Sequence, residues 1–427
     1  MSETLATPTR ATPKYVIEKT KPSVIANDGE LHCVSNRSAN EVGAVADKAL
    51  EFNWVKSRAD FDALEDDWND LFEIAGQGNQ VFQTFAWCWH WCNAFLDKDG
   101  KDAHQLSILT ARQNGRLIMV WPLVITKKTG LKVLAWMGEP VSQYGDVLVD
   151  TTASNTVLQQ AWALLQGDGN IDYIQLRRVR ADSQIAKLLP AIAATPSNEV
   201  LAPSENLAKF ENYDTYADQH CSRRARRNRG RLRRRLEERG NIEFRKVEQG
   251  AEAKALTIQA LELKQIWLVA RGRASPALAD PRTTKFFTDV AEKSAHQTGY
   301  VFRGVFCDGE LIAAEIAFQC KGRNALHIIV FDINYEKVGA GIYLLEKTFA
   351  AAIEQGIEIY DLLAPGDRYK LEWCDDTVVV QDWARGVSFA GHVWCRVYLN
   401  FLRGWMKNIW NWMPLTLRQQ FKKLFER

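Results

Sequence analysis

Hydrophobic and polar positions alternate in two separate stretches of the chain, each centred on a two-residue turn. LSILTARQNGRLIMVWPLVI, from Leu106, alternates around Asn114-Gly115, and FRGVFCDGELIAAEIAF, from Phe302, alternates around Asp308-Gly309. Such dipeptides favour the tight turn of a β-hairpin. A segment with helical periodicity and then a short apolar strand follow each hairpin: VLQQAWALLQ and IDYIQL, then GIYLLEKTFAAAIEQ and IEIYDLL. The repeated order of hairpin, strand, helix and strand predicts an α/β fold with two domains built on mixed sheets.

The second copy carries a loop suited to an anion. Gly339 and Gly341 open its predicted helix, and Gly356 stands where that helix should end. Glycine lets backbone N–H groups approach a ligand, and the N-terminal end of a helix favours negative charge. The segment predicts a phosphate-cradling loop, although a helix that simply begins after a glycine turn has the same pattern. The first copy lacks this Gly-x-Gly, so a phosphorylated cofactor is expected in the second.

Composition divides the chain into five parts. We expect residues 1–45, rich in Thr, Ser, Ala and Pro, to be disordered. Residues 46–205 form the first predicted domain, without a cofactor, and residues 251–387 the second. An Arg-rich helical linker, 206–250, separates them, and a basic, Trp-rich helical tail, 388–427, ends the chain.

The overall composition is that of an ordinary globular protein, with 46% hydrophobic and 25% charged residues in 427. We find no apolar run of eighteen residues and no secretory signal pattern, and the eight cysteines lack framework spacing. These features predict a cytoplasmic protein with reduced thiols.

Basic residues are concentrated in two segments of a chain whose net charge is only +2. Residues 222–239 hold ten Arg against two Glu, and residues 388–427 hold seven Lys or Arg against one Glu. Anionic partners such as nucleic acid, a membrane surface or a phosphorylated substrate fit both segments. The Arg-rich helix also fits a linker whose arginines pair within the protein. The tail fits a helix on the inner face of the membrane or tryptophans that cap a core.

Four motifs resemble the GNAT acyltransferase superfamily and, within it, the CelD-like group of cellulose biosynthesis. They are FQTFAWCWHWCNAF at Phe82, WPLVI at Trp121, EKVGAG at Glu336, and YDLLAPGDRYKLEW at Tyr360. The resemblance covers roughly residues 50–387. In it, Leu362 replaces the family's Phe, Gly366 comes one position late, and Glu336 replaces the usual Gln or Arg.

The resemblance implies tandem GNAT-like domains. The second would bind acetyl-CoA or another acyl-CoA through Val338, Gly339, Ala340 and Gly341, while the first would contribute to the acceptor cleft. The implied reaction is N-acetylation of an amino sugar or other amine in polysaccharide or cell-envelope biosynthesis. Fem-type aminoacyltransferases share the tandem architecture and take their acyl group from charged tRNA, an alternative that the Arg-rich helix favours. A non-catalytic, membrane-peripheral assembly factor is a third hypothesis.

Acyl transfer to an amine requires aligned reactants, donors for the oxyanion, a base and an acid. Strand residues near Ile329–Phe331 are candidates for the oxyanion donor. Asp361 is the favoured base and Glu315 its rival, although strand alternation also fits Glu315 on a solvated face. Tyr369 is the candidate acid or acceptor ligand. Lys370 is expected to pair with Asp361 or to meet a substrate phosphate.

The sequence predicts no metal site. Cys88 and Cys92 share one face of a helix, and His90 lies on the other side. Cys374 follows Trp373 but lacks an identifiable base, so a cysteine nucleophile is not expected.

Overall fold

The computed structural model describes residues 50–96, 104–153, 155–192 and 194–397. The predicted disordered segment, 1–45, and the tail from residue 398 lie outside these residues. We call residues 50–206 the N-terminal half and residues 207–397 the C-terminal half; both belong to one compact unit.

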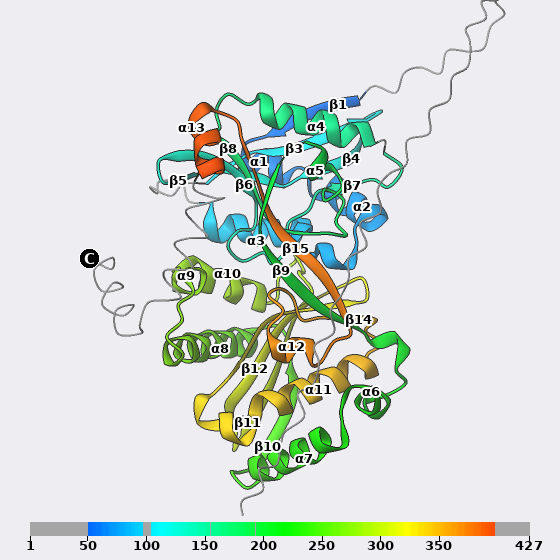
Figure 1. Ribbon diagram of the computed structural model, residues 1–427, viewed down its shortest axis with the longest axis vertical. Helices are drawn as coiled ribbons and strands as arrows, with labels where there is room; N and C mark the ends of the chain where they lie inside the picture. The colour runs from blue at the N-terminus through cyan, green and yellow to red at the C-terminus, as the bar shows by residue number, and fades with distance from the viewer. Residues whose placement is uncertain (1–49, 97–103, 154, 193, 398–427) are drawn as a thin grey trace, which may run out of the picture. The chain divides into compact units, whose positions relative to one another are not determined.

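Two sheets form the framework (Figure 1). The four-stranded sheet has the order β1 (Leu50–Val55), β3 (Ile108–Gln113), β4 (Arg116–Trp121) and β7 (Leu148–Val149). The eleven-stranded sheet has the order β10 (Ile242–Val247), β11 (Tyr300–Cys307), β12 (Glu310–Cys320), β13 (Arg323–Phe331), β14 (Ile359–Asp361), β9 (Thr195–Asn206), β15 (Asp376–Gly386), β8 (Tyr173–Arg180), β6 (Leu131–Trp136), β5 (Leu123–Lys128) and β2 (Gln105–Leu106). The large sheet is mixed, because β13–β14 and β6–β8 are parallel and its other pairs are antiparallel.

The two halves share the large sheet through β9 and β15. These strands pair antiparallel with each other; β9 also pairs with β14 of the C-terminal half, and β15 pairs with β8 of the N-terminal half. Figure 1 shows both strands running between the halves. β15 therefore lies within the predicted second domain in sequence yet extends the sheet of the first. The domain boundaries themselves stay a prediction.

Both predicted hairpins are confirmed. Gln113 pairs with Arg116 and Cys307 with Glu310, which leaves two-residue turns between them. Asn114 and Gly115 have φ of 53° and 78°, and Asp308 and Gly309 have φ of 50° and 86°. Positive φ at both turn positions is the geometry that matches the twist of the flanking strands.

Helices cover the sheets. They are α1 (Arg58–Asp62), α2 (Glu65–Ala75), α3 (Phe85–Phe95), α4 (Asn155–Gly167), α5 (Leu188–Ala191), α6 (Tyr213–His220), α7 (Arg223–Glu237), α8 (Ala251–Ala270), α9 (Pro276–Ala279), α10 (Pro281–Ala291), α11 (Ala340–Glu354), α12 (Arg368–Leu371) and α13 (Phe389–Val393). Short 3₁₀ turns lie at Gly78–Gln83, Leu207–Lys209 and Ile333–Val338. No helix in the described ranges is long and apolar enough to cross a membrane.

α8 and α11 cover opposite faces of the C-terminal half of the sheet. Leu256 of α8 shares a core cluster with Ala314, whereas Leu344 of α11 shares one with Ala313. Consecutive residues of a strand point to opposite faces. The core also continues between the halves, because the Trp87 ring of α3 lies 4.8 Å from the rings of both Phe286 and Phe318.

The Arg-rich segment forms the expected helix, α7, but Gly230 does not interrupt it. A glycine within a helix costs only about 1 kcal/mol. Leu236, which is fully buried, and Leu232, which packs beside Gly339, hold the part of the helix after Gly230 against the protein.

Candidate active site

A cavity of about 780 Å³ opens at the N-terminus of α11. Helices α7, α8, α11 and α12, strand β13 and the segments next to them contribute its lining: Ala225, Asn228, Arg229, Lys264, Trp267, Leu268, Arg273, Ile329, Phe331, Glu336, Gly339, Gly341, Ile342, Leu345, Pro365, Asp367, Tyr369, Glu372 and Trp373. We call it the α11 cavity. Its volume lies in the range of small-molecule and cofactor sites.

The glycines at the start of α11 shape this cavity. Gly339 has φ of 81°, a left-handed conformation, and a Cβ on Gly341 would come within 2.7 Å of the Phe331 ring. The first amides of a helix have no intrahelical partner and attract anions. Gly341 therefore brings backbone donors close to the cavity without a side chain in the way. Val338 and Ala340, the other predicted cofactor residues, are buried beside it.

Glu336, the acidic departure from the family loop, is paired. Arg271 forms an ion pair with the carboxylate of Glu336. The Cζ atom of Arg271 lies 3.9 Å from the centre of the Trp267 ring. The ion pair offsets the negative charge that Glu336 would otherwise place near a diphosphate.

Two of the cations that line the cavity lie on different helices. The guanidinium of Arg229, on α7, lies 4.2 Å from the Trp373 ring centre. Lys264, on α8, donates from Nζ to the carbonyl of Ile329 at 2.8 Å. Burial lowers the pKa of Lys264 to about 8, since it disfavours the charged form. Lys264 thus contacts the strand region from which the oxyanion donor was expected.

Tyr369 and Lys370 are neighbours in sequence, but their side chains lie in different surroundings. Tyr369 lines the α11 cavity. Burial raises the pKa of its hydroxyl, and the negative charge of the nearby Asp367 raises it further. Lys370 is buried and donates from Nζ to the carbonyl of Leu363 at 2.9 Å. The expected ion pair between Lys370 and Asp361 is therefore not what the structure shows. Arginines, with their planar fork of donors, take that role instead.

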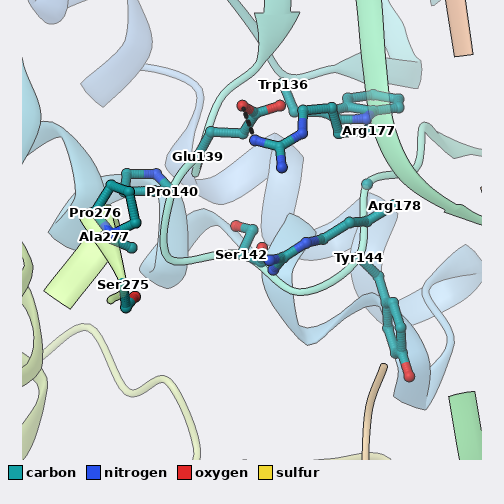
Figure 2. Close-up of a pocket in the computed structure, with 11 residues that line it drawn as sticks. Trp136, Glu139, Pro140, Ser142, Tyr144, Arg177, Arg178, Ser275, Pro276 and Ala277 are labelled. Atoms are coloured by element: carbon teal, nitrogen blue, oxygen red, sulfur yellow. Dashed lines mark hydrogen bonds and ion pairs between the residues drawn. The ribbon is translucent and has the colours of Figure 1, made fainter. Parts of the chain in front are cut away.

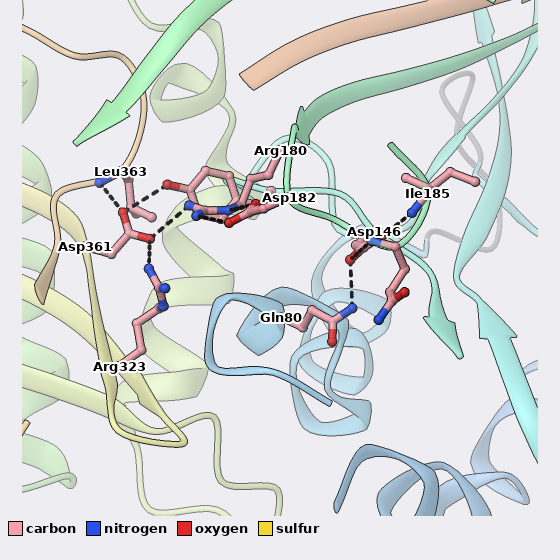
Figure 3. A network of polar contacts seen from close by, with 10 residues as sticks. Gln80, Asp146, Arg180, Asp182, Ile185, Arg323, Asp361 and Leu363 are labelled. Carbon is pink, nitrogen blue, oxygen red and sulfur yellow. Dashed lines mark hydrogen bonds and ion pairs between the residues drawn. The ribbon is translucent and has the colours of Figure 1, made fainter. Parts of the chain in front are cut away.

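Asp361 is fully buried at the junction of the halves (Figure 3). Its Oδ2 accepts from Arg323 at 2.8 Å and from Arg180 at 3.3 Å. Its Oδ1 accepts from the Tyr144 hydroxyl at 3.0 Å and from the Leu363 amide at 2.9 Å. Four donors fill the carboxylate, and Asp361 is not among the cavity-lining residues. This geometry favours a positioning role over proton abstraction.

Glu315 is also fully buried, so the interpretation as a solvated residue was wrong. Arg303 donates to Oε1 at 2.9 Å, and the Tyr360 hydroxyl donates to Oε2 at 2.7 Å. Ala313 and Ala317 are buried as well, because α11 covers the face that alternation assigned to solvent.

A second, smaller cavity of about 260 Å³ lies between the halves (Figure 2). The loop from Glu139 to Gly145 and the β8 residues Arg177 and Arg178 form one wall, and Ser275–Ala277 form the other. Arg178 donates to the Ser142 carbonyl at 3.0 Å and to Gln143 Oε1 at 2.6 Å. The sequence did not predict a role for Arg177 or Arg178, because neither belongs to a recognisable motif. The Gly- and Pro-containing loop beside them was the one signal that could have indicated a site here.

Comparisons with known proteins agree with this architecture. Residues 223–371 match the acetyltransferase (GNAT) domain family. Among solved structures, FemX is 10% identical, with a TM-score of 0.52 over 78% of this chain and 98% of FemX. A tandem GNAT protein from the clavulanic acid biosynthesis pathway is 13% identical, with a TM-score of 0.46 over 80% of this chain and 99% of its own. L-PGS from Bacillus licheniformis is 12% identical, with a TM-score of 0.46 over 78% of this chain and 95% of the L-PGS chain. No curated protein sequence matches this chain.

Within the C-terminal half, residues 223–371 thus match an acetyltransferase (GNAT) domain, and the predicted class of enzyme, an acyltransferase, is confirmed. The predicted mixed α/β fold of GNAT type is confirmed as well. Membership of the CelD-like group stays a prediction.

Proposed function

We propose that this protein is an acyl-CoA-dependent N-acyltransferase whose donor binds in the α11 cavity. The observation that carries the proposal is the entrance of α11, where a left-handed Gly339 and a side-chain-free Gly341 border a 780 Å³ cavity beside helix amides. When bound, acyl-CoA supplies the reactive thioester. The residues fit it: the amides at Ala340 and Gly341 suit the diphosphate, and Arg229 and Lys264 add positive charge.

The cavity also holds groups suited to proton transfer. Tyr369, whose pKa is raised above the ordinary tyrosine value, is protonated at neutral pH, and a protonated hydroxyl suits donation to a departing thiolate. Asp367 lines the same cavity; its charge adds to the raised pKa of Tyr369 and partly opposes the lowering of the Lys264 pKa by burial. We assign Asp367 as the group that accepts the ammonium proton, and Asp361 as a positioning residue.

The acceptor is proposed from the CelD-like resemblance: an amino sugar or another amine used in polysaccharide or cell-envelope assembly. The second cavity supports an acceptor site between the halves, because both line it. A cytoplasmic location, with contact to the inner face of the membrane through the tail, belongs to the same proposal.

Calorimetric titration with acetyl-CoA tests the donor site. Wild-type protein is expected to bind, and Gly341→Trp to lose binding because its indole would fill the diphosphate seat. Gly167→Trp is the matched control, since this exposed position at the end of α4 has open space around it. Absence of binding by the wild type, or undiminished binding by Gly341→Trp, would contradict the proposal. Circular dichroism of each variant checks its fold.

A second candidate, transfer from aminoacyl-tRNA, is favoured by the surface of α7. Nine arginines between Arg223 and Arg239 are exposed, and within the described residues Arg226 is the one among them with a carboxylate ion-pair partner. Several unpaired cations on one helix suit a polyanion, and FemX shares the fold. Retention of tRNA with a steep salt dependence would support this candidate; salt-insensitive or absent binding would remove it.

The remaining hypothesis is a non-catalytic, membrane-peripheral assembly factor. Full complementation of a deletion strain by both Gly341→Trp and Asp361→Asn, together with absent tRNA binding, would favour it over both enzymatic proposals.

A further inference from the structure

Glu205, His220 and Asp375 converge from distant parts of the chain behind the wall of the α11 cavity. Glu205 lies near the end of β9, His220 ends α6, and Asp375 precedes β15. One ligand atom from each lies within 4.8 Å of the other two. Glu205 is fully buried, the His220 side chain is only 5% exposed, and the Asp375 side chain is 50% exposed, which leaves one path to solvent.

The tautomer of His220 leaves a lone pair facing two carboxylates. Nδ1 lies 3.2 Å from the Tyr216 carbonyl, which accepts only, so Nδ1 carries the proton. Nε2 then lies 3.3 Å from Glu205 Oε2 and 3.2 Å from Asp375 Oδ1. It is buried and makes no hydrogen bond of acceptable geometry with either. In the neutral tautomer the Nε2 lone pair thus faces two carboxylate oxygens, an arrangement that a cation bound between them would stabilise.

The other polar atoms of the three side chains are engaged elsewhere. Lys209 pairs with Glu205 Oε1 at 2.7 Å, and Gln219 donates to Asp375 Oδ2 at 3.1 Å. Metal-binding side chains are commonly held in this way, with the non-coordinating atom hydrogen-bonded to a neighbour. Oε2, which also accepts from the Asp375 amide at 2.7 Å, faces Oδ1 and Nε2.

We propose that these three atoms bind a divalent transition metal, with zinc as the best fit. Zinc binds imidazole nitrogen and carboxylate oxygen at about 2.1 Å, which separates neighbouring ligand atoms by roughly 3.0 to 3.4 Å. The two distances from Nε2 fall in that range. Water would complete the coordination from the exposed side of Asp375.

The bound cation would hold part of the α11 cavity in place. Asp375 comes two residues after Trp373, which lines the cavity. His220 lies three residues before the start of the Arg-rich helix, whose Arg229 stacks on Trp373. The site therefore ties β9, α6 and the segment after α12 together without contacting the proposed acyl donor.

Titration of chelator-treated, full-length protein with zinc chloride tests the site. We expect one equivalent to bind in the micromolar range, His220→Gln to lose binding, and Asp375→Asn to bind more than about tenfold more weakly. His392→Gln, which replaces an exposed histidine of α13, should bind like the wild type. Asp375→Asn changes a half-exposed side chain, so it remains informative if His220→Gln fails to fold.

Cobalt substitution identifies the ligands. Cobalt held by nitrogen and oxygen should show no thiolate-to-metal charge-transfer band, whereas a cysteine site would show one. Absence of metal binding, a thiolate band, or undiminished binding by Asp375→Asn would overturn the proposal. None of these readouts depends on acetyl-CoA binding or on transferase activity.

Discussion

Replacing Asp361 by Asn separates a structural role from a catalytic one. Asn retains the shape and still accepts from Tyr144 and Leu363 through one oxygen, but its NH₂ group would face the donors of Arg180 and Arg323. Removing one partner of a buried ion pair costs about 3–5 kcal/mol. Arg180 keeps its second carboxylate, Asp182 at 2.8 Å, so we expect the lower figure, about 3 kcal/mol.

Urea unfolding followed by tryptophan fluorescence measures this loss, and acetyl-transfer kinetics accompany it. Asp376→Asn, an exposed carboxylate of β15, is the control and should change the free energy of unfolding by less than about 0.5 kcal/mol. The reasoning fails if Asp361→Asn unfolds within about 1 kcal/mol of wild type while kcat falls more than about a hundredfold. That pair of results would make Asp361 the base.

Three further predictions concern the cavity and its walls. Acetyl-CoA affinity should fall as pH rises through about 8, where Lys264 loses its charge, and this step should disappear in Lys264→Met; a flat wild-type profile from calorimetry would contradict it. Arg229→Met removes the guanidinium that lies 4.2 Å from the Trp373 ring and should weaken acetyl-CoA binding about fivefold, for about 1 kcal/mol; unchanged affinity argues against its role. Leu236→Ala in the fully buried anchor of α7 should lower the free energy of unfolding by about 2–5 kcal/mol, measured in urea, and a loss below about 1 kcal/mol would show that α7 is held in some other way.

Local patterns predicted the elements of the candidate site well. The alternation around Asp308-Gly309 predicted the hairpin, and Gly339 and Gly356 lie at the two ends of α11 with φ of 81° and 69°. These features depend on neighbours within a few residues, where glycine conformation and periodicity act directly.

The environment of each ionisable residue did not follow from sequence. Glu315 occupies an alternating position that fits either face of a sheet, and only the packing of α11 buries it. Asp361 meets Arg180 and Tyr144 across more than 180 positions, so spacing offered no sign of its partners.

The amino-acid sequence by itself determined the two hairpins, the glycine-bordered helix and the Arg-rich helix, because each is specified by short-range periodicity and turn chemistry. The tertiary structure decided that β9 and β15 join the halves in one sheet, that Asp361 is enclosed by donors, and that Glu205, His220 and Asp375 meet. Strand pairing and the burial of charge are set by which distant surfaces pack together, and residue spacing along the chain carries no record of that choice.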